Sequence, residues 1–510
     1  MIRAVDEAAA IVGRLLGLGV TEAVLAPGSR SGPLALALHA ADAQGLLRLH
    51  VRVDEREAGF LALGLAKVLR RPVPVVTTSG TAVANLHPAM LEARHADVPL
   101  IAVTADRPGR LRGTGANQTT DQRSIFPRVP FVSSVHALVG GPAHFNVELD
   151  EPLLEPVEWL FAPADVSPTS TTEVTPVRLA AGPRTVVVAG DDAGPEARRL
   201  AEFARWPLLA EPTSGARTGE ALTTYRLLVE RFDDRIERVV SFGHATLSRP
   251  VTRLLSRTDV EIVHVGDQST FPVPAGANVS FVESVGAEAD DPAWLDEWRA
   301  ADAAATAAID GLLDGSTPYD VARTVAAAVP PGGLLVVGSS SPVRDLDLVA
   351  RPFPVGERRL VVGNRGLAGI DGLLSTAIGA ALGRPSPRSL AMVGDLSFLH
   401  GANGLLIGPH EPRPSLTIVV PNDDGGSIFA TLEQGAPEHA AAFERVYATP
   451  TGTDLAALCA AHGVAHRRVE PADLAAALAV EPDGIEVVEV PVDRHGRRDL
   501  TARIQAAVRA

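Results

Sequence analysis

The chain has 510 residues, 46% hydrophobic and 21% charged, with a formal net charge of −15. That length predicts about three domains, since domains average ~150 residues, and the composition is that of an ordinary globular protein. The acidic balance argues against nucleic-acid binding, because a phosphate-binding surface normally shows a basic excess. No apolar run reaches the ~18 residues of a membrane span. Asp6 and Glu7 stand where a signal peptide would have a basic start and an apolar core, so we expect a cytoplasmic protein.

From residue 20 onward, short β-rich runs alternate with helical patterns, which predicts a parallel, doubly wound sheet. The predicted strands are 22–26, 47–53, 73–78 and 100–104, and the predicted helices are 34–43, 55–69 and 82–93. Polar or glycine-rich turns follow three of these strands, at 27–30, 54–55 and 78–81. Ligands bind at the carboxyl ends of parallel strands, so we expect a site at this edge.

The stretch 166–176 is rich in Ser, Thr and Pro and is typical of a linker. Two further series of β-rich runs follow, separated by an acidic, alanine-rich helical segment at 290–313. Their predicted strands are 185–189, 239–242 and 262–265, then 334–337, 359–362, 389–393 and 416–420. We therefore predict an α/β protein with three doubly wound parallel-sheet domains in series: 1–165, a linker at 166–183, 184–315 and 316–510.

Two rare residue types exclude several classes of enzyme. Cys459 is the only cysteine, which rules out an intrachain disulfide and a cysteine metal cluster. Lys67 is the only lysine and lies in a helical pattern rather than a Gly-Lys-Ser/Thr loop, so the chain is no P-loop nucleotide hydrolase and a poor candidate for a pyridoxal enzyme. The absence of a Gly-x-Ser-x-Gly elbow weakens an α/β-hydrolase interpretation.

Three consecutive strand ends of the third domain carry potential ligand groups. A glycine-rich loop at 363–372 follows the first, Gly394-Asp395 ends the second and Asn422-Asp423-Asp424 ends the third. Glycines let backbone N–H groups approach an anion at a helix N-terminus, although a tight turn would explain such a loop equally well. Carboxylate and amide oxygens suit a hard cation that leaves positions for phosphate oxygens. The sequence thus predicts a site for Mg²⁺ and a diphosphate.

This arrangement resembles the thiamine-diphosphate-dependent enzymes, in which a Gly-Asp pair and a later Asn/Asp cluster hold Mg²⁺ or Mn²⁺ and the cofactor. The resemblance covers the whole chain, since pyrimidine-binding, central and diphosphate-binding domains follow one another in that superfamily. It implies that Asp395, Asp423 and the backbone carbonyl of Gly425 bind the metal, while counting forward from Asp395 selects Asn422 instead of Asp423. The implied cofactor contacts are Glu55, Thr78, Gly80, Asn85, Gly369, Ile370, Gly394, Asp395, Leu396, Ser397, Ile428 and Phe429. For Ile428 and Phe429, core packing is almost as good an explanation.

Finer motifs at 26–31, 54–56, 78–85, 115–118 and 363–366 resemble the menaquinone-pathway synthases. These transferases decarboxylate 2-oxoglutarate and add the succinyl unit to isochorismate in a 1,4-addition. The resemblance makes Glu55 the catalytic residue that hydrogen-bonds the aminopyrimidine ring. Without the resemblance, Glu55 would be interpreted as a solvated acid at a helix start, where the helix dipole favours a negative charge.

Both substrates are dicarboxylates, which guanidinium groups bind bidentately. The substrate contacts that the resemblance implies are Ser29, Arg30, Gln118, Ser340, Arg344 and Arg365. Arg249 is a further candidate, at a place where the family often has a basic pair and this chain has Arg-Pro. For any single arginine, a surface salt bridge is the commoner role.

Three alternatives stay open. Another thiamine-dependent 2-oxoacid decarboxylase or acetohydroxyacid-type synthase would usually act on substrates with fewer carboxylates. A nicotinamide or flavin oxidoreductase would need Gly-x-Gly-x-x-Gly with a later acid, which is missing. A non-catalytic binding protein would not need an intact Glu55 and Asp395. The resemblance also implies a homodimer or tetramer with active sites at the subunit interface.

Overall fold

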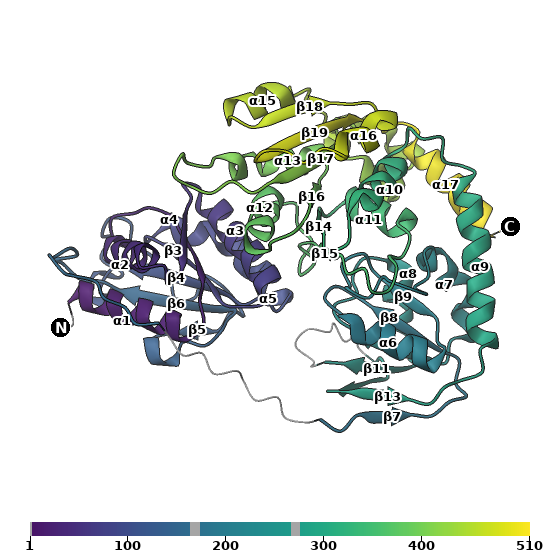
Figure 1. The fold of residues 1–510 in the computed structure, drawn as a ribbon, viewed down its shortest axis with the longest axis horizontal. Coiled ribbons are helices and arrows are strands. Elements are labelled where there is room, and N and C mark those ends of the chain that lie inside the picture. The colour runs from purple at the N-terminus through teal and green to yellow at the C-terminus, as the bar shows by residue number, and fades with distance from the viewer. Residues whose placement is uncertain (1–2, 164–173, 267–275, 510) are drawn as a thin grey trace. The chain divides into compact units, whose positions relative to one another are not determined.

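The computed structural model describes residues 3–163, 174–266 and 276–509. Its strands form parallel sheets of six, five and six strands and a two-stranded parallel pair (Figure 1), which confirms the predicted α/β class. Contacts divide the chain into two compact units. Unit 1 comprises Met1–Ser170, Gly366–Pro385 and Phe398–Pro414, and unit 2 comprises Thr171–Arg365, Ser386–Ser397 and Ser415–Ala510.

Unit 1 contains a six-stranded parallel sheet with the order β2-β1-β3-β4-β6-β5. Its strands are β1 (Glu22–Leu25), β2 (Arg48–Val51), β3 (Val73–Thr77), β4 (Leu100–Asp106), β5 (Phe131–Val132) and β6 (Ala143–Glu148). The central strands β3 and β4 are buried along their whole length, as expected where helices cover both faces of a parallel sheet.

Helices cover both faces of this sheet. They are α1 (Ala4–Gly17), α2 (Gly32–Ala43), α3 (Glu55–Leu69), α4 (Thr81–Asn85), α5 (His87–His95) and α12 (Leu373–Gly383). Apolar side chains of α1 and α2 pack with β1, β3 and β4 in one core, while α3 and α5 contact the strands and each other. The helix predicted at 82–93 is two helices separated by Leu86, because Pro88 lacks the N–H needed to continue one helix.

Unit 2 contains a five-stranded parallel sheet, in the order β12-β11-β10-β8-β9, and the pair β13-β7. The strands are β7 (Val177–Leu179), β8 (Thr185–Ala189), β9 (Leu208–Ala210), β10 (Arg238–Phe242), β11 (Glu261–Val265), β12 (Val279–Val282) and β13 (Val285–Ala287). The helices are α6 (Pro195–Ala204), α7 (Tyr225–Phe232), α8 (Arg249–Leu254) and α9 (Ala293–Asp310). Of the predicted linker 166–183, residues 166–173 lie outside the described residues, and the remainder contains β7.

A second six-stranded parallel sheet of unit 2 has the order β15-β14-β16-β17-β19-β18. Its strands are β14 (Leu334–Val337), β15 (Leu360–Val362), β16 (Ser389–Met392), β17 (Leu416–Asn422), β18 (Ala465–Arg468) and β19 (Ile485–Pro491). The helices of this part are α10 (Pro318–Ala328), α11 (Ser341–Val349), α14 (Ala440–Phe443), α15 (Leu455–Ala461), α16 (Leu474–Leu478) and α17 (Arg497–Arg509). Helix α13 (Asp395–His400) begins three residues after the end of β16.

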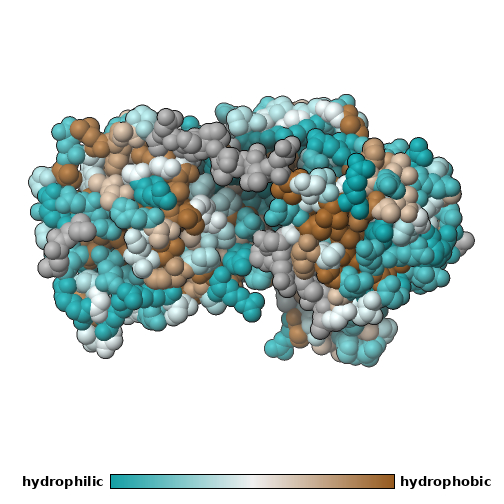
Figure 2. Space-filling view, turned by 90° about the horizontal axis from the view of Figure 1, so that it is seen from below, coloured by the Kyte–Doolittle hydropathy of each residue, from teal (hydrophilic) through white to brown (hydrophobic). Residues whose placement is uncertain are grey.

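The surface mixes polar and apolar side chains. Exposed large apolar residues are spread along the chain, including Val53, Leu160 and Phe203, and Figure 2 shows hydrophobic patches interrupted by hydrophilic residues on the face it presents. Within the described ranges, no helix combines the length and the apolar character that crossing a membrane requires.

Candidate active site

Glu55 is the first residue of α3, directly after the turn that follows β2. Asp54 caps this helix, because its side chain accepts a hydrogen bond from the N–H of Glu57 (3.2 Å). Asn85, the last residue of α4, donates to Oε2 of Glu55 at 3.1 Å. Two residues predicted to contact the cofactor are therefore in direct contact at the carboxyl edge of the first sheet.

The loop after β3 brings Thr78 and Gly80 together with Gln118. Gly80 has φ +80°, and a Cβ there would lie 2.8 Å from Cγ of Gln118, so this approach requires glycine. Gln118 donates from Nε2 to the carbonyl of Ser79 at 2.7 Å. Thr78 is buried, and a Cβ at Gly28 would lie 2.3 Å from the Thr78 Cβ. Three predicted loops of unit 1 thus pack closely at one edge of the sheet.

Arg30 and Arg107 lie near each other at this edge. Arg30 donates from Nη1 to the carbonyl of Leu149 at 3.1 Å, and Arg107 donates from Nη1 to the carbonyl of Gln118 at 2.7 Å. Partial burial and the positive charge of Arg30 lower the pKa of Arg107. Two guanidinium groups held close together favour a negatively charged group beside them, and Nη2 of Arg30 already pairs with the exposed Glu151 at 3.4 Å. Ser29 is exposed beside them.

Arg107 was missing from the residues predicted from the sequence. It directly follows β4, so the strand-end argument that selected 27–30, 54–55 and 78–81 would have found it had it been extended to the fourth strand.

Gly369 and Ile370 belong to the loop that leads into α12, and Gly369 is exposed while Ile370 is half-buried. The start of this loop is fixed by Glu92 of α5. Its two carboxylate oxygens accept the backbone N–H groups of Gly366 and Leu367 at 2.6 and 2.7 Å. The loop is therefore anchored a few residues before the predicted cofactor contacts.

The buried Asp395 and the half-buried Asp423 form an acidic pair in unit 2. Asp395 follows Gly394 at the start of α13, is 5% exposed, and accepts the N–H of Gly425 on Oδ2 at 2.8 Å. Burial and the negative charge of Asp423 raise the pKa of Asp395 to about 7. Burial also raises the pKa of Asp423, whose Oδ1 has no hydrogen-bond partner among the described residues. Two desolvated carboxylates in mutual repulsion form a donor set that a hard cation would stabilise.

Asn422, the alternative to Asp423, has its amide group already engaged. Its Nδ2 donates to Oε1 of Glu489 at 2.9 Å, and its Oδ1 accepts the N–H of Asp424 at 2.9 Å. No cluster of three or more His, Cys, Asp or Glu side chains able to hold a metal occurs in the described part of the chain. A cation here would rely on two carboxylates, with backbone and phosphate oxygens completing its shell. Gly394, Leu396 and Ser397 adjoin Asp395 on the same turn.

A second arginine pair lies in unit 2. Arg344 donates from Nη1 to the carbonyl of Ser340 (2.8 Å), a residue with φ +71°. Burial and the positive charges of Arg365 and Arg226 lower the pKa of Arg344. Arg365 is 2% exposed, and its Nε and Nη1 have no hydrogen-bond partner among the described residues. Buried N–H donors without a protein partner favour an anionic ligand, because such groups are costly to leave unpaired.

Glu211, which the sequence had not indicated, lies close to Arg365. Its Oε1 accepts the N–H of Leu247 at 2.9 Å. Burial raises its pKa to about 8, while the charge of Arg365 acts in the opposite direction. Glu211 follows β9, another strand end, but its closeness to Arg365 comes from a tertiary arrangement that sequence spacing does not reveal.

The remaining predicted residues have weaker structural support. Arg249 is exposed and pairs with Glu433 at 2.9 Å, which fits an ordinary surface ion pair. Ile428 and Phe429 lie half-buried in a short 3-10 helix (Ser427–Thr431), where the ring of Phe429 contacts that of Tyr447 at 5.8 Å between centroids.

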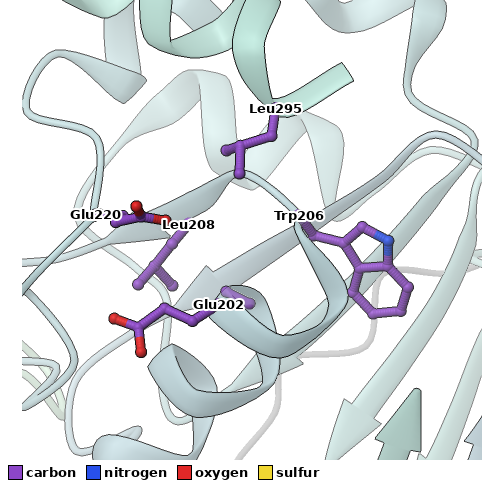
Figure 3. A pocket seen from close by; sticks show the side chains of 6 residues that line it. Glu202, Trp206, Leu208, Glu220 and Leu295 are labelled. Carbon is purple, nitrogen blue, oxygen red and sulfur yellow. The ribbon is translucent and has the colours of Figure 1, made fainter. Parts of the chain in front are cut away.

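A small pocket is lined by residues of α6, β9 and α9, and none of the residues discussed above is among them (Figure 3). Its volume is about 10 Å³, which is roughly the room that one water molecule needs. The two carboxylates in its wall, Glu202 and Glu220, pair with Arg198 and Arg299. It therefore offers neither the space nor the free charge for a dicarboxylate.

Comparison with known proteins agrees with this geometry. The family model of the thiamine pyrophosphate enzyme N-terminal TPP binding domain matches residues 6–125, and that of the C-terminal TPP binding domain matches 348–490. The chain is thus a thiamine pyrophosphate enzyme. It is 57% identical to a 2-succinyl-5-enolpyruvyl-6-hydroxy-3-cyclohexene-1-carboxylate synthase of Nocardioides sp., over 97% of this chain and 96% of that protein. Proteins of the same name from Kineococcus radiotolerans and Saccharopolyspora erythraea are 48% and 43% identical, each covering 99% of this chain and 98% of the relative. The chain belongs to the family of these synthases.

Proposed function

We propose that this protein decarboxylates 2-oxoglutarate and adds the succinyl unit to isochorismate, giving 2-succinyl-5-enolpyruvyl-6-hydroxy-3-cyclohexene-1-carboxylate for menaquinone biosynthesis. The observation that carries the proposal is the 57% identity over nearly the whole chain to a synthase of that name. The two arginine pairs at strand ends support it, since both substrates are dicarboxylates.

Thiamine diphosphate would be held together with Mg²⁺ or Mn²⁺ by the acidic pair. Asp395 and Asp423 supply side-chain oxygens and Gly425 a backbone carbonyl. The raised pKa of Asp395 and the unpaired Oδ1 of Asp423 support a cation at this place, and the engaged amide of Asn422 favours Asp423 as the ligand.

When bound, thiamine diphosphate supplies the nucleophilic carbon that adds to the ketone and accepts the electrons released with CO₂. Glu55 is the proton-handling residue of this site, because a carboxyl group that hydrogen-bonds the aminopyrimidine ring stabilises the tautomer that can remove the proton of that carbon. Asn85 holds Oε2 of Glu55 and so orients the carboxyl group. Orientation of this kind is a large part of catalysis.

Arg30, Arg107, Arg344 and Arg365 bind the substrate carboxylates, with Ser29, Gln118 and Ser340 as hydrogen-bonding neighbours. Ile428 and Phe429 would limit water at the reacting carbon and so protect the transferred unit from premature protonation. Arg249 stays a minor candidate because it is exposed and paired with Glu433. We also expect a homodimer or tetramer located in the cytoplasm.

The direct test incubates the purified protein with thiamine diphosphate, Mg²⁺, 2-oxoglutarate and isochorismate, and measures CO₂ and the adduct. Pyruvate in place of 2-oxoglutarate is the control, because a decarboxylase of simpler 2-oxoacids would prefer it. The E55Q variant should keep its fold and lose activity by about a hundredfold or more, the usual worth of an acid–base group. Full activity of E55Q, or preference for pyruvate, would refute the proposal.

A further inference from the structure

Glu57 is a buried carboxylate in the first turn of α3, two residues after Glu55. It is 1% exposed. The hydroxyl of Ser375 in α12 donates to its Oε2 at 2.6 Å, and Nη2 of Arg56 donates to its Oε1 at 3.2 Å. A carboxylate removed from water is stable only when its oxygens are hydrogen-bonded. Glu57 meets this requirement by joining α3 to α12.

The same turn of α3 is tied to a second segment of unit 1. Nη2 of Arg56 also donates to the carbonyl of His400 at 2.7 Å, and Nδ2 of Asn403 donates to Oδ2 of Asp54, the helix cap, at 2.8 Å. The backbone of Gly404 lies close to the hydrogen bond between Glu57 and Ser375, since a Cβ at Gly404 would lie 3.0 Å from Oε2 of Glu57. Each residue from Asp54 to Glu57 thus has a named hydrogen-bond partner, and Glu55 lies in the middle of this anchored turn.

The two helices that Glu57 joins are also fixed further along α3. A Cβ at Gly64 of α3 would lie 2.2 Å from the carbonyl oxygen of Thr376 in α12. The backbones are therefore in contact at the residue that follows Ser375. Ser375 is accordingly a rigid hydrogen-bond donor, and the position of the Glu57 carboxylate is set by α12.

We propose that Glu57 is a positioning residue, which holds the first turn of α3 against Ser375 and so fixes the direction in which Glu55 presents its carboxyl group. The proposal rests on the proposed function only in the role given to Glu55. It predicts that weakening the contact changes proton handling at the cofactor and leaves substrate affinity largely unchanged.

The charges around Glu57 give the contact a pH dependence. The groups that face Glu57 are Asp54, the cap of α3, Arg56 of α3 and the Ser375 hydroxyl of α12. Residues 400–404 contribute the backbone of His400 and Gly404 and the neutral side chain of Asn403. Burial raises the pKa of Glu57 to about 7, the bonds from Ser375 and Arg56 lower it, and Asp54 raises it. As pH falls through about 7, the carboxylate takes up a proton and its charge-assisted bonds weaken. Removing the Ser375 hydroxyl should move this transition to higher pH.

The test compares E57Q and S375A with wild type and with E22Q. Glu22 is a suitable control, because it pairs with the buried His50 at 2.7 Å but begins β1, at the opposite edge of the sheet. In the cofactor-free protein, hydrogen–deuterium exchange of peptides spanning 54–58 reports how firmly the turn is held. We expect faster exchange in S375A, and wild-type exchange in E22Q.

In the cofactor-loaded protein, the exchange rate of the thiazolium C2 proton with D₂O is measured by quench and NMR across the neutral pH range. We expect E57Q to slow this exchange roughly tenfold or more, since misplacement of a catalytic group by an ångström costs up to about a hundredfold. The acid limb of the wild-type profile of exchange rate against pH should disappear in E57Q and move to higher pH in S375A. The KM for 2-oxoglutarate should stay within about twofold of the wild-type value in both variants, because substrate binding does not use this interaction.

Wild-type rates and profiles in both variants would overturn the proposal, and so would wild-type C2 exchange in E55Q, because Glu55 would then need no positioning. C2 exchange requires no substrate. If the wild type exchanges this proton but forms no adduct, the proposed reaction fails while the role of Glu57 stands.

Discussion

Replacing Gly64 with alanine should destabilise unit 1, because α3 and α12 meet there backbone to backbone. A Cβ at Gly64 would lie 2.2 Å from the carbonyl oxygen of Thr376, and one at Gly379 would lie 2.2 Å from that of Leu61. Real Cβ atoms essentially never come within 3.0 Å of another heavy atom. The helices would have to separate, and overpacking of this kind costs about 3 kcal/mol at the upper end of its usual range.

Part of that cost is offset by helix propensity, since alanine is favoured over glycine by about 1 kcal/mol inside a helix. The net loss for G64A is then about 2 kcal/mol, which lowers the melting temperature of a unit of this size by roughly 4 to 8 °C. Gly13 is a matched control, because it lies exposed inside α1 and a Cβ there would have no atom within 4 Å. G13A should gain the propensity term alone and melt about 2 to 4 °C higher.

Thermal unfolding followed by circular dichroism and calorimetry checks both variants. G379A should behave like G64A, and the double variant should lose less than the sum of the two, because one separation of the helices relieves both contacts. A G64A protein that melts at or above the wild-type temperature, while G13A rises as expected, would refute the close approach of the two backbones.

Three further outcomes follow from the candidate site. Burial raises the pKa of Glu211 from 4.5 to about 8, so the neutral carboxyl group favours the folded state. The free energy of unfolding should therefore fall as pH rises between these two values. Chemical denaturation at pH 5 and pH 8.5 should show a smaller fall in this free energy for E211Q than for the wild type. D423N should weaken Mn²⁺ binding about tenfold or more in a titration followed by electron paramagnetic resonance, and wild-type affinity should fall below about pH 7 as Asp395 takes up a proton. R365K should raise the KM for 2-oxoglutarate about tenfold, because the ammonium group of lysine cannot bind a carboxylate through two parallel hydrogen bonds as a guanidinium group does. R249A should change this KM less than about twofold, because Arg249 forms only an exposed ion pair with Glu433.

Strands buried on both faces were the part of the fold that the sequence showed best. The observed β3, β8 and β14 fall within the predicted runs 73–78, 185–189 and 334–337, because such strands are continuous apolar runs. Strand β6 was not predicted although most of it is buried. Its His144 and Asn146 bond to Thr104 of β4 at 2.8 and 2.9 Å. A strand whose buried side chains satisfy one another by hydrogen bonds does not show an apolar pattern.

The sequence predicted those residues of the candidate site that lie near the ends of strands. Residues that lie within a few positions of a strand end, such as Glu55 and Asp395, can be found from spacing and from resemblance. Glu57 could not be, because Asp54-Glu55-Arg56-Glu57 has the composition of a solvated helix start. Its burial comes from α12 and from residues 400–404, more than 300 residues away along the chain, and no local pattern encodes such a contact.

The carboxyl groups whose pKa is shifted fall into two sets according to the direction of the shift. Among the described residues, the acids whose pKa is lowered are exposed, apart from the half-buried Asp150, and most of them lie beside arginine: Asp6, Asp150, Glu237, Asp259, Glu297, Asp314 and Glu433. The acids whose pKa is raised by burial are Glu57, Glu211, Asp345, Asp395 and Asp423. Every member of the second set is a candidate site residue, lies within two residues of one in the sequence or faces one in space. Burying a carboxylate lowers stability unless its charge is used. Strongly desolvated acids cluster at functional sites more often than elsewhere, so this distribution supports the roles proposed for Asp395 and Asp423, whereas Asp345 is held in a buried ion pair with Arg497.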